Sequence, residues 1–272
     1  MQTLRQNRLF QLGAVITLFW LVVAAAAPIL APDDPLRTEA LRAEQPPSMK
    51  NPLGTDKYGR DILARLLFGT RYDLLIAVLS VGLAVAAGII LGSIAGLGPG
   101  YLDQILMRLS DMILAFPSFV LALVLVAVLG PNLFSVILAL AVRYTPMNAC
   151  LVRAEILAER SKDYALAARA MGSGVCRLAL RHLIPNILPS LLTQATMHMA
   201  WAILTSAGLS FIGAGVQPPT PEWGVMVSEG SPYIVSGHWW MSFFPGAAIV
   251  AMTAGFILMG EALGGIQETS NL

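Results

Sequence analysis

The sequence is poor in charge. Only 12% of its 272 residues are Asp, Glu, Lys or Arg, whereas 56% are hydrophobic. Soluble domains carry about 25% charged residues, so this deficit excludes an ordinary soluble protein and indicates an integral membrane protein. The apolar runs are continuous and do not alternate, which favours membrane-spanning helices over the strands of a β-barrel.

Cysteine and phosphate-binding motifs are also scarce. The two cysteines, Cys150 and Cys176, lie in or beside a stretch that we expect in the cytoplasm, where thiols stay reduced. We therefore expect neither a disulfide nor a metal site. The glycine-rich stretch 92–100 lacks the Lys-Ser/Thr ending of a nucleotide-binding loop, and no segment free of predicted spans is long enough for a separate catalytic domain.

Six apolar runs predict an all-α polytopic membrane protein with about six transmembrane helices, since one span needs about 20 residues. The predicted spans are 9–30, 74–97, 112–129, 133–152, 190–212 and 242–265. We divide the chain into 1–73, which is the first span plus an external or interfacial segment, and a five-span core, 74–272. The stretch 61–68 is amphipathic and predicts a helix on the membrane surface. Gly and Ala in the second span predict close helix packing.

The distribution of basic residues predicts the orientation. The loop 153–189 holds six Lys or Arg and three acids, and each basic residue costs about 2.5–3.5 kcal/mol in hydrocarbon. This loop is therefore expected in the cytoplasm, together with both termini, while the loop 213–241, which has no Lys or Arg, is expected outside. Seven basic residues in 31–73, balanced by seven acids, oppose this topology.

The cytoplasmic loop has the pattern of a helix–turn–helix. Residues 164–171 are almost all helix formers, Gly172 fits a helix C-cap, 178–183 can form a second short helix, and Pro185 and Pro189 are expected to break the chain. Ala167, Ala168 and Met171 would present a small-residue face to a groove in another protein. The alternative is a solvated loop that binds anionic lipid through its arginines.

The same residues carry a family resemblance. The run Ala167-Ala-Arg-Ala-Met-Gly172, nine further residues and then His182-Leu-Ile-Pro185 resembles the EAA loop of bacterial ABC-importer permeases. Leu166 stands where that family usually has Glu, and Asp163 is our candidate for its substitute. The runs 52–61, 181–189, 209–215 and 222–224 resemble the second permease subunit of the branch that imports peptides and nickel, so the resemblance covers nearly the whole chain.

The resemblance implies a type I ABC importer permease fold and a transport subunit of the bacterial inner membrane, not an enzyme. The chain would form half of a path for di- or oligopeptides or nickel (a metal chelate) delivered by an external binding protein, which would face 31–73 and 213–241. The expected partners are a second homologous permease in a heterodimer, two ATPase subunits and the lipid bilayer, with no nucleic acid. ATP and Mg would bind to the ATPases, and no cofactor or metal to this chain. The residues implied in coupling to an ATPase are Asp163, Ala167, Ala168, Met171, Gly172 and Pro185.

Three polar residues inside the spans are candidates for the translocation path: Arg143, Asn148 and His198. A charged Arg143 is costly unless it lines water or is paired, so it either contacts a substrate carboxylate or chelate, or forms a structural pair. His198 lies between two Met residues that do not share its helix face, which favours packing over metal binding. Near the third span, Arg108 and Asp111 are spaced to pair across one helical turn, with Asp103 nearby.

Two other classes of membrane protein are alternatives. An intramembrane enzyme needs paired aspartates or an activated nucleophile within the spans. No mid-span Asp pair exists, and Ser206 and Ser210 with His198 lack a glycine-rich elbow. A secondary transporter should show inverted repeats, and the sequence shows none.

Overall fold

The computed structural model describes residues 7–31 and 33–270, with side chains described as far as 265. Within these residues the fold is helical, and a single isolated bridge between Thr55 and Asp61 is the only strand-like pairing. The elements in chain order are α2 (Arg8–Leu30), η1 (Ala40–Arg42), α3 (Ile62–Leu97), α4 (Gly100–Leu114), α5 (Ser118–Leu129), α6 (Leu133–Glu159), α7 (Asp163–Ala170), α8 (Val175–Leu178), η2 (Ala179–Leu183), α9 (Ile184–Phe211), α10 (Trp223–Gly230), η3 (Ser231–Tyr233) and α11 (Trp240–Ser270).

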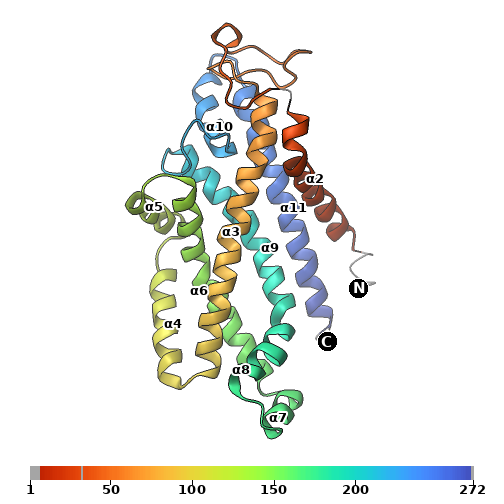
Figure 1. The fold of residues 1–272 in the computed structure, drawn as a ribbon, viewed down its shortest axis with the longest axis vertical. Helices are drawn as coiled ribbons and strands as arrows, with labels where there is room; N and C mark the ends of the chain where they lie inside the picture. Colours follow the sequence, from red (N-terminus) through yellow and green to blue (C-terminus); the bar gives the residue numbers. More distant parts are fainter. Residues whose placement is uncertain (1–6, 32, 271–272) are drawn as a thin grey trace.

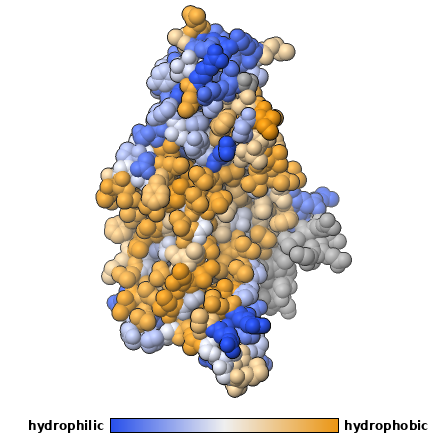
Figure 2. Space-filling model, viewed as in Figure 1, coloured by the Kyte–Doolittle hydropathy of each residue, from blue (hydrophilic) through white to orange (hydrophobic). Residues whose placement is uncertain are grey.

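Five long helices, α2, α3, α6, α9 and α11, run along the long axis of the molecule (Figure 1). Five helical segments are long and apolar enough to cross a membrane, or up to six if the bent pair α4–α5 is one span. Apolar side chains form a band across the middle of the molecule, and polar ones gather at its two ends (Figure 2). The segment 33–61 and α10 lie at one end and α7 at the other (Figure 1). The predicted polytopic helical architecture is confirmed.

Helix α3 is longer than expected. It starts directly after Asp61, whose Oδ1 accepts a hydrogen bond from the Ala64 N–H at 2.7 Å, and it continues for 36 residues. Its length is about 54 Å, against about 30 Å of hydrocarbon. The prediction of a separate surface helix at 61–68 is therefore wrong, since these residues are the first turns of α3. The boundary drawn at residue 73 also lies inside this helix.

The bounds predicted for the third span, 112–129, are also wrong. Helix α4 already includes the residues expected as a polar approach, and α4 and α5 meet at an angle of 92°. Pro117 lies at the N-cap of α5, where its missing N–H costs little. With 12 residues, α5 is about 18 Å long and cannot cross the membrane alone.

The ion pair near this bend differs from the predicted one. Among the described residues, Arg108 and Asp111 form no ion pair. Asp103 instead receives two hydrogen bonds from Arg153 of α6, from Nε to Oδ1 and from Nη2 to Oδ2, the latter at 2.6 Å. This bidentate pair joins α4 to α6 and has the geometry in which arginine binds a carboxylate best.

Close packing of α3 against α6 depends on glycine, as predicted. Gly88, Gly92 and Gly96 recur every four residues and share one face of α3. A Cβ atom on Gly88 would lie 2.4 Å from the Asn148 Cβ, and one on Gly92 would lie 2.6 Å from the Val152 Cβ. No larger residue fits at either position without a shift of the two helices.

Ion pairs hold the segment 33–61 and the start of α3 against α10. Glu229 Oε2 accepts from Arg60 at 2.7 Å and from Arg65 at 3.0 Å, and Arg60 also pairs with Asp56 at 2.5 Å. Both arginines are buried, at 3% and 1% side-chain exposure. The basic residues that oppose the predicted orientation are thus largely neutralised by carboxylates; those with an acidic partner are Arg37, Arg42, Lys57, Arg60 and Arg65.

Candidate functional site

The loop after α6 folds into a helical hairpin, α7–α8, at one end of the molecule (Figure 1). Gly172 ends α7 with φ +83°, and a Schellman motif closes the turn: the Ser173 N–H donates to the Ala168 carbonyl at 3.0 Å, and the Gly172 N–H donates to Arg169 at 2.9 Å. The predicted helix end at Gly172 is confirmed, with Gly172 one position after the C-cap, which is Met171. Nothing lies within 4 Å of a Cβ built on Gly172, so this corner is open to a partner.

The hairpin packs on its own small apolar cluster, formed by Val152, Ile156, Ala165, Ala168, Leu178, Leu183, Ile187 and Leu191. Ala168 is only 2% exposed. The expectation that it faces outward with Ala167 is therefore wrong, because Ala165 and Ala168 let α7 lie close to the chain's own helices. The outward face holds Ala167, Leu166 and Met171, and Met171 is 82% exposed.

Glu159 joins the hairpin to α6 and α9. One of its carboxylate oxygens accepts from Lys162 Nζ at 2.6 Å, and the other accepts from the Tyr164 hydroxyl at 2.5 Å. Asn186 donates to that hydroxyl at 3.3 Å. Burial and the neighbouring Glu159 raise the pKa of Tyr164 to about 12, so the hydroxyl stays protonated and donates.

These three residues, Glu159, Tyr164 and Asn186, were missed by the sequence reasoning. Asp163, our candidate substitute for the family Glu, begins α7 but is exposed and makes no side-chain capping bond; Glu159 makes the anchoring contacts instead. The one signal in the sequence was an acid three residues before a lysine, a spacing that pairs across one turn.

The prolines after the hairpin do not break the chain. Pro185 lies in the first turn of α9, where a missing N–H is tolerated, and Pro189 lies inside that helix. The predicted helix at 178–183 is mostly the π-helical turn η2, which joins α8 to α9. Residues Val175–Phe211 thus form one candidate span of 37 residues.

The three predicted path residues come together between α6 and α9. The Tyr144 ring stacks on His198, with the ring centroids 4.5 Å apart. The Arg143 guanidinium lies over the Tyr144 ring, 4.5 Å from its centroid. Asn148 Nδ2 lies 3.5 Å from His198 Nδ1, and Gln194 Nε2 lies 3.0 Å from His198 Nε2. Tyr144 and Gln194 complete a cluster that the sequence indicated only in part.

A buried pair of carboxyl groups lies near the other end of the molecule. Asp73 of α3 accepts from the Trp223 N–H at 3.2 Å, and Glu222 accepts from the Val225 N–H at 2.8 Å as the N-cap of α10. Both side chains are fully buried, and the two groups interact. Burial raises the pKa of Glu222 to about 7. No sequence pattern predicted this pair, because its members are 149 positions apart.

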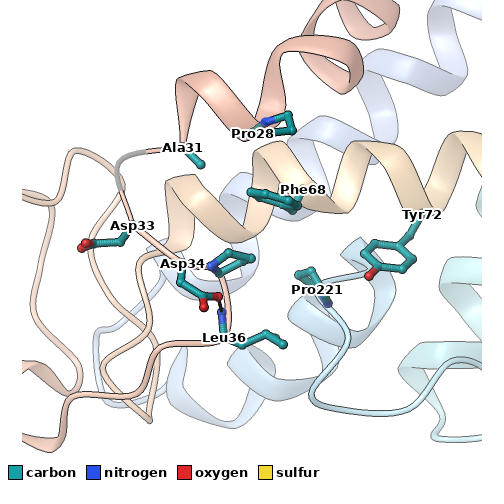
Figure 3. A pocket seen from close by; sticks show the side chains of 9 residues that line it. Pro28, Ala31, Asp33, Asp34, Leu36, Phe68, Tyr72 and Pro221 are labelled. Atoms are coloured by element: carbon teal, nitrogen blue, oxygen red, sulfur yellow. Dashed lines mark hydrogen bonds between the residues drawn. The ribbon is translucent and has the colours of Figure 1, made fainter.

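A pocket of about 660 Å³ opens beside this pair, where the segment after α2 meets the loop before α10. Phe68 and Tyr72 of α3 lie on one side and Pro221 on another (Figure 3). The remaining lining residues are Pro28, Ala31, Asp33, Asp34, Pro35 and Leu36. The pocket therefore joins the two segments that we expect to face a binding protein.

The chain matches the model of a known family. Residues 88–270 match the family described as "Binding-protein-dependent transport system inner membrane component". The chain belongs to this family. Residues 1–47 also match the "N-terminal TM domain of oligopeptide transport permease C".

Permeases from three bacteria are similar to this chain over most of its length. The "Di/tripeptide transport system permease protein DppC" of Pseudomonas aeruginosa is 40% identical over 93% of this chain and 85% of its own length. The "Dipeptide transport system permease protein DppC" of Bacillus subtilis is 34% identical over 96% and 81%. The "Probable D,D-dipeptide transport system permease protein DdpC" of Escherichia coli is 38% identical over 92% and 84%.

The fold also matches a solved permease. The methionine ABC transporter MetNI, in inward-facing conformations, superposes with a TM-score of 0.56 at 19% identity, over 74% of this chain and 97% of that chain. The family prediction and the permease fold are confirmed. This binding-protein-dependent permease is a multi-pass transport subunit of an ABC importer and not an enzyme, since ATP hydrolysis belongs to separate ATPase subunits.

Proposed function

We propose that this permease forms one half of the translocation path of a peptide importer in the bacterial inner membrane. The supporting observation is its identity of 34–40% with permeases named for dipeptides or di- and tripeptides, over more than nine-tenths of the chain. Peptides are therefore favoured over nickel, the other substrate that the sequence left open. Its partners are a second, non-identical permease, two ATPase subunits that bind ATP and Mg, and an external binding protein.

Coupling is assigned to the α7–α8 hairpin. Its outward residues are Ala167, Met171 and Gly172, with Asp163 at the start of α7 and Pro185 where the chain enters α9. The anchoring of Tyr164 to Glu159 and Asn186 makes the hairpin move with α6 and α9. A displacement imposed by the ATPases then reaches both helices that carry the polar cluster around His198.

Reconstitution tests the function directly. The full complex in proteoliposomes is expected to accumulate a labelled dipeptide only with ATP and the binding protein present, and to leave nickel outside. A matched complex whose ATPase subunits cannot hydrolyse ATP is the control. Uptake by the permease alone, without ATP, would contradict the assignment.

The proposed orientation places both termini and the hairpin in the cytoplasm. Cys176 is an exposed native thiol in α8, so a membrane-impermeant thiol reagent should label it in inverted vesicles and not in intact cells. A Val235→Cys substitution, at a side chain that is 96% exposed in the opposite end, should give the reverse result in a Cys176→Ser background. Labelling of Cys176 from outside the cell would show that the orientation is the reverse of the proposed one.

A further inference from the structure

Arg143 is a charge held near the middle of a spanning helix. It lies ten residues after the start of α6, about 15 Å along a membrane core of about 30 Å. Its Nε and Nη1 atoms are buried, and neither has a hydrogen-bond partner. An unpaired arginine at this depth costs at least about 2.5–3.5 kcal/mol, so the site needs something that offsets this cost.

The chain itself does not offset it. Within the described residues, no carboxylate forms an ion pair with Arg143; its neighbours are the Tyr144 side chain, with the ring centroid at 4.5 Å, and His198. A cation–π contact contributes about 0.5–2 kcal/mol, which is less than the cost. The structural pair that the sequence allowed for Arg143 is thus not found among these residues.

Nor does Arg143 reach for the membrane surface. A snorkelling arginine places its guanidinium in water or among headgroups, whereas here the Nε and Nη1 atoms are buried against the Tyr144 ring. The residue is nonetheless partly exposed, and Met147, one turn further on the same face, is 39% exposed. A charged helix face is unstable against lipid, so this face belongs to the path rather than to the bilayer.

The Tyr144 ring, over which the guanidinium lies, is held in place by His198. His198 stacks on Tyr144, and both ring nitrogens of His198 have an amide neighbour, Asn148 at 3.5 Å and Gln194 at 3.0 Å. These contacts fix the Tyr144 ring and, through it, the direction of the two free N–H groups of Arg143. His198 is therefore a positioning residue in this cluster.

We propose that Arg143 receives the C-terminal carboxylate of the peptide as it crosses the membrane, an inference that rests on the proposed function. A guanidinium with unpaired N–H groups is a strong, charge-assisted hydrogen-bond donor to a carboxylate. The carboxylate, in turn, supplies the negative charge that the described part of the chain does not place beside Arg143. The ligand class is a short peptide with a free C-terminus.

The test compares two labelled probes in the full reconstituted importer: alanyl-alanine and its C-terminal amide. Each is used at a concentration that saturates the binding protein, established by titrating its fluorescence, so that selection by that protein is removed. The readout is peptide taken up per ATP hydrolysed. The variants are Arg143→Gln, Arg143→Lys, which keeps the charge but not the planar fork, and, as the control, Val142→Leu at an exposed side chain on another face of α6.

Arg143→Gln is expected to lower uptake of the free dipeptide per ATP roughly tenfold to a hundredfold, the range for hydrogen bonds to a charged group, and to leave uptake of the amide unchanged. Arg143→Lys should restore part of the loss, and Val142→Leu should match the unmodified complex for both probes. Equal losses for both probes, or no loss for either, would overturn the proposal. If the unmodified complex moves neither probe with ATP, the proposed function itself fails.

Discussion

Gly172 permits a sharp test of how the hairpin couples. Its φ of +83° lies in the left-handed region, where a residue with a Cβ costs about 1–2 kcal/mol. Nothing in the chain lies within 4 Å of that Cβ, so a substitution here adds backbone strain without an internal clash. A cost of 1–2 kcal/mol lowers the equilibrium ratio of the native to the opened turn by a factor of about 5–30.

We therefore expect Gly172→Val to lower peptide uptake per ATP by about 5- to 30-fold, because the Schellman turn that sets the hairpin opens. Binding-protein affinity should not change. Gly172→Asn should lose much less, since Asn adopts the left-handed conformation more readily. Gly174→Ala is the matched control: Gly174 has φ −66° and equally open surroundings, so it should behave as the unmodified protein.

The assay measures uptake and ATP hydrolysis in the same proteoliposomes. Normal coupling in the Gly172→Val complex would refute the role of this turn. Equal loss in the Asn and Val variants would refute the strain argument, and would assign the effect to bulk that clashes with an ATPase surface.

Three further predictions concern the anchor, the carboxyl pair and the helix packing. Tyr164→Phe removes the hydroxyl between Glu159 and Asn186, at about 1 kcal/mol, and should lower coupling about fivefold, whereas Tyr101→Phe on exposed α4 should not. Because the pKa of Glu222 is raised to about 7, the stability that its protonated form contributes is complete below about pH 4.5 and is lost as the pH rises through 7. The melting temperature should thus fall between pH 5 and 8. Glu222→Gln leaves the neighbouring Asp73 of α3 and Ser206 and Ser210 of α9 in place, and should make the melting temperature depend less on pH. An unchanged pH dependence in this variant would contradict the role given to Glu222. Gly92→Val should destabilise the α3–α6 contact by about 1–3 kcal/mol or more, while Gly82→Val, which meets nothing within 4 Å, should not; equal melting temperatures would count against glycine-dependent packing.

The sequence predicted the features that depend on hydropathy and on single turn residues. Continuous apolar runs located the long helices, and Gly172 was identified as a cap because few other residues adopt its backbone conformation. The errors at 61–68 and 112–129 have one cause: the polarity of a stretch does not show in which direction its helix runs. The prediction therefore missed that α3 continues beyond the membrane and that the chain turns by 92° near Pro117.

The site was predictable in part for a similar reason. Arg143, Asn148 and His198 were identified because polar residues within spans are costly. Their mutual contacts, and the links from Glu159 to Asn186 and from Asp73 to Glu222, depend on helix packing between distant positions. Ala168 was assigned to the wrong face because alanine suits both a docking surface and a close internal contact.

The length of α3 has a mechanical consequence. At one end, buried ion pairs from Arg65 and its neighbour Arg60 hold it to Glu229 of α10; at the other, Arg160, just after α6, donates to the Gly96 carbonyl at 2.8 Å. An unbroken helix of about 54 Å that is fixed at both ends acts as a rigid lever. A tilt of about 5° moves one end by about 5 Å relative to the other, so a small rotation beside the hairpin becomes a displacement of several ångströms at the opposite end of the molecule.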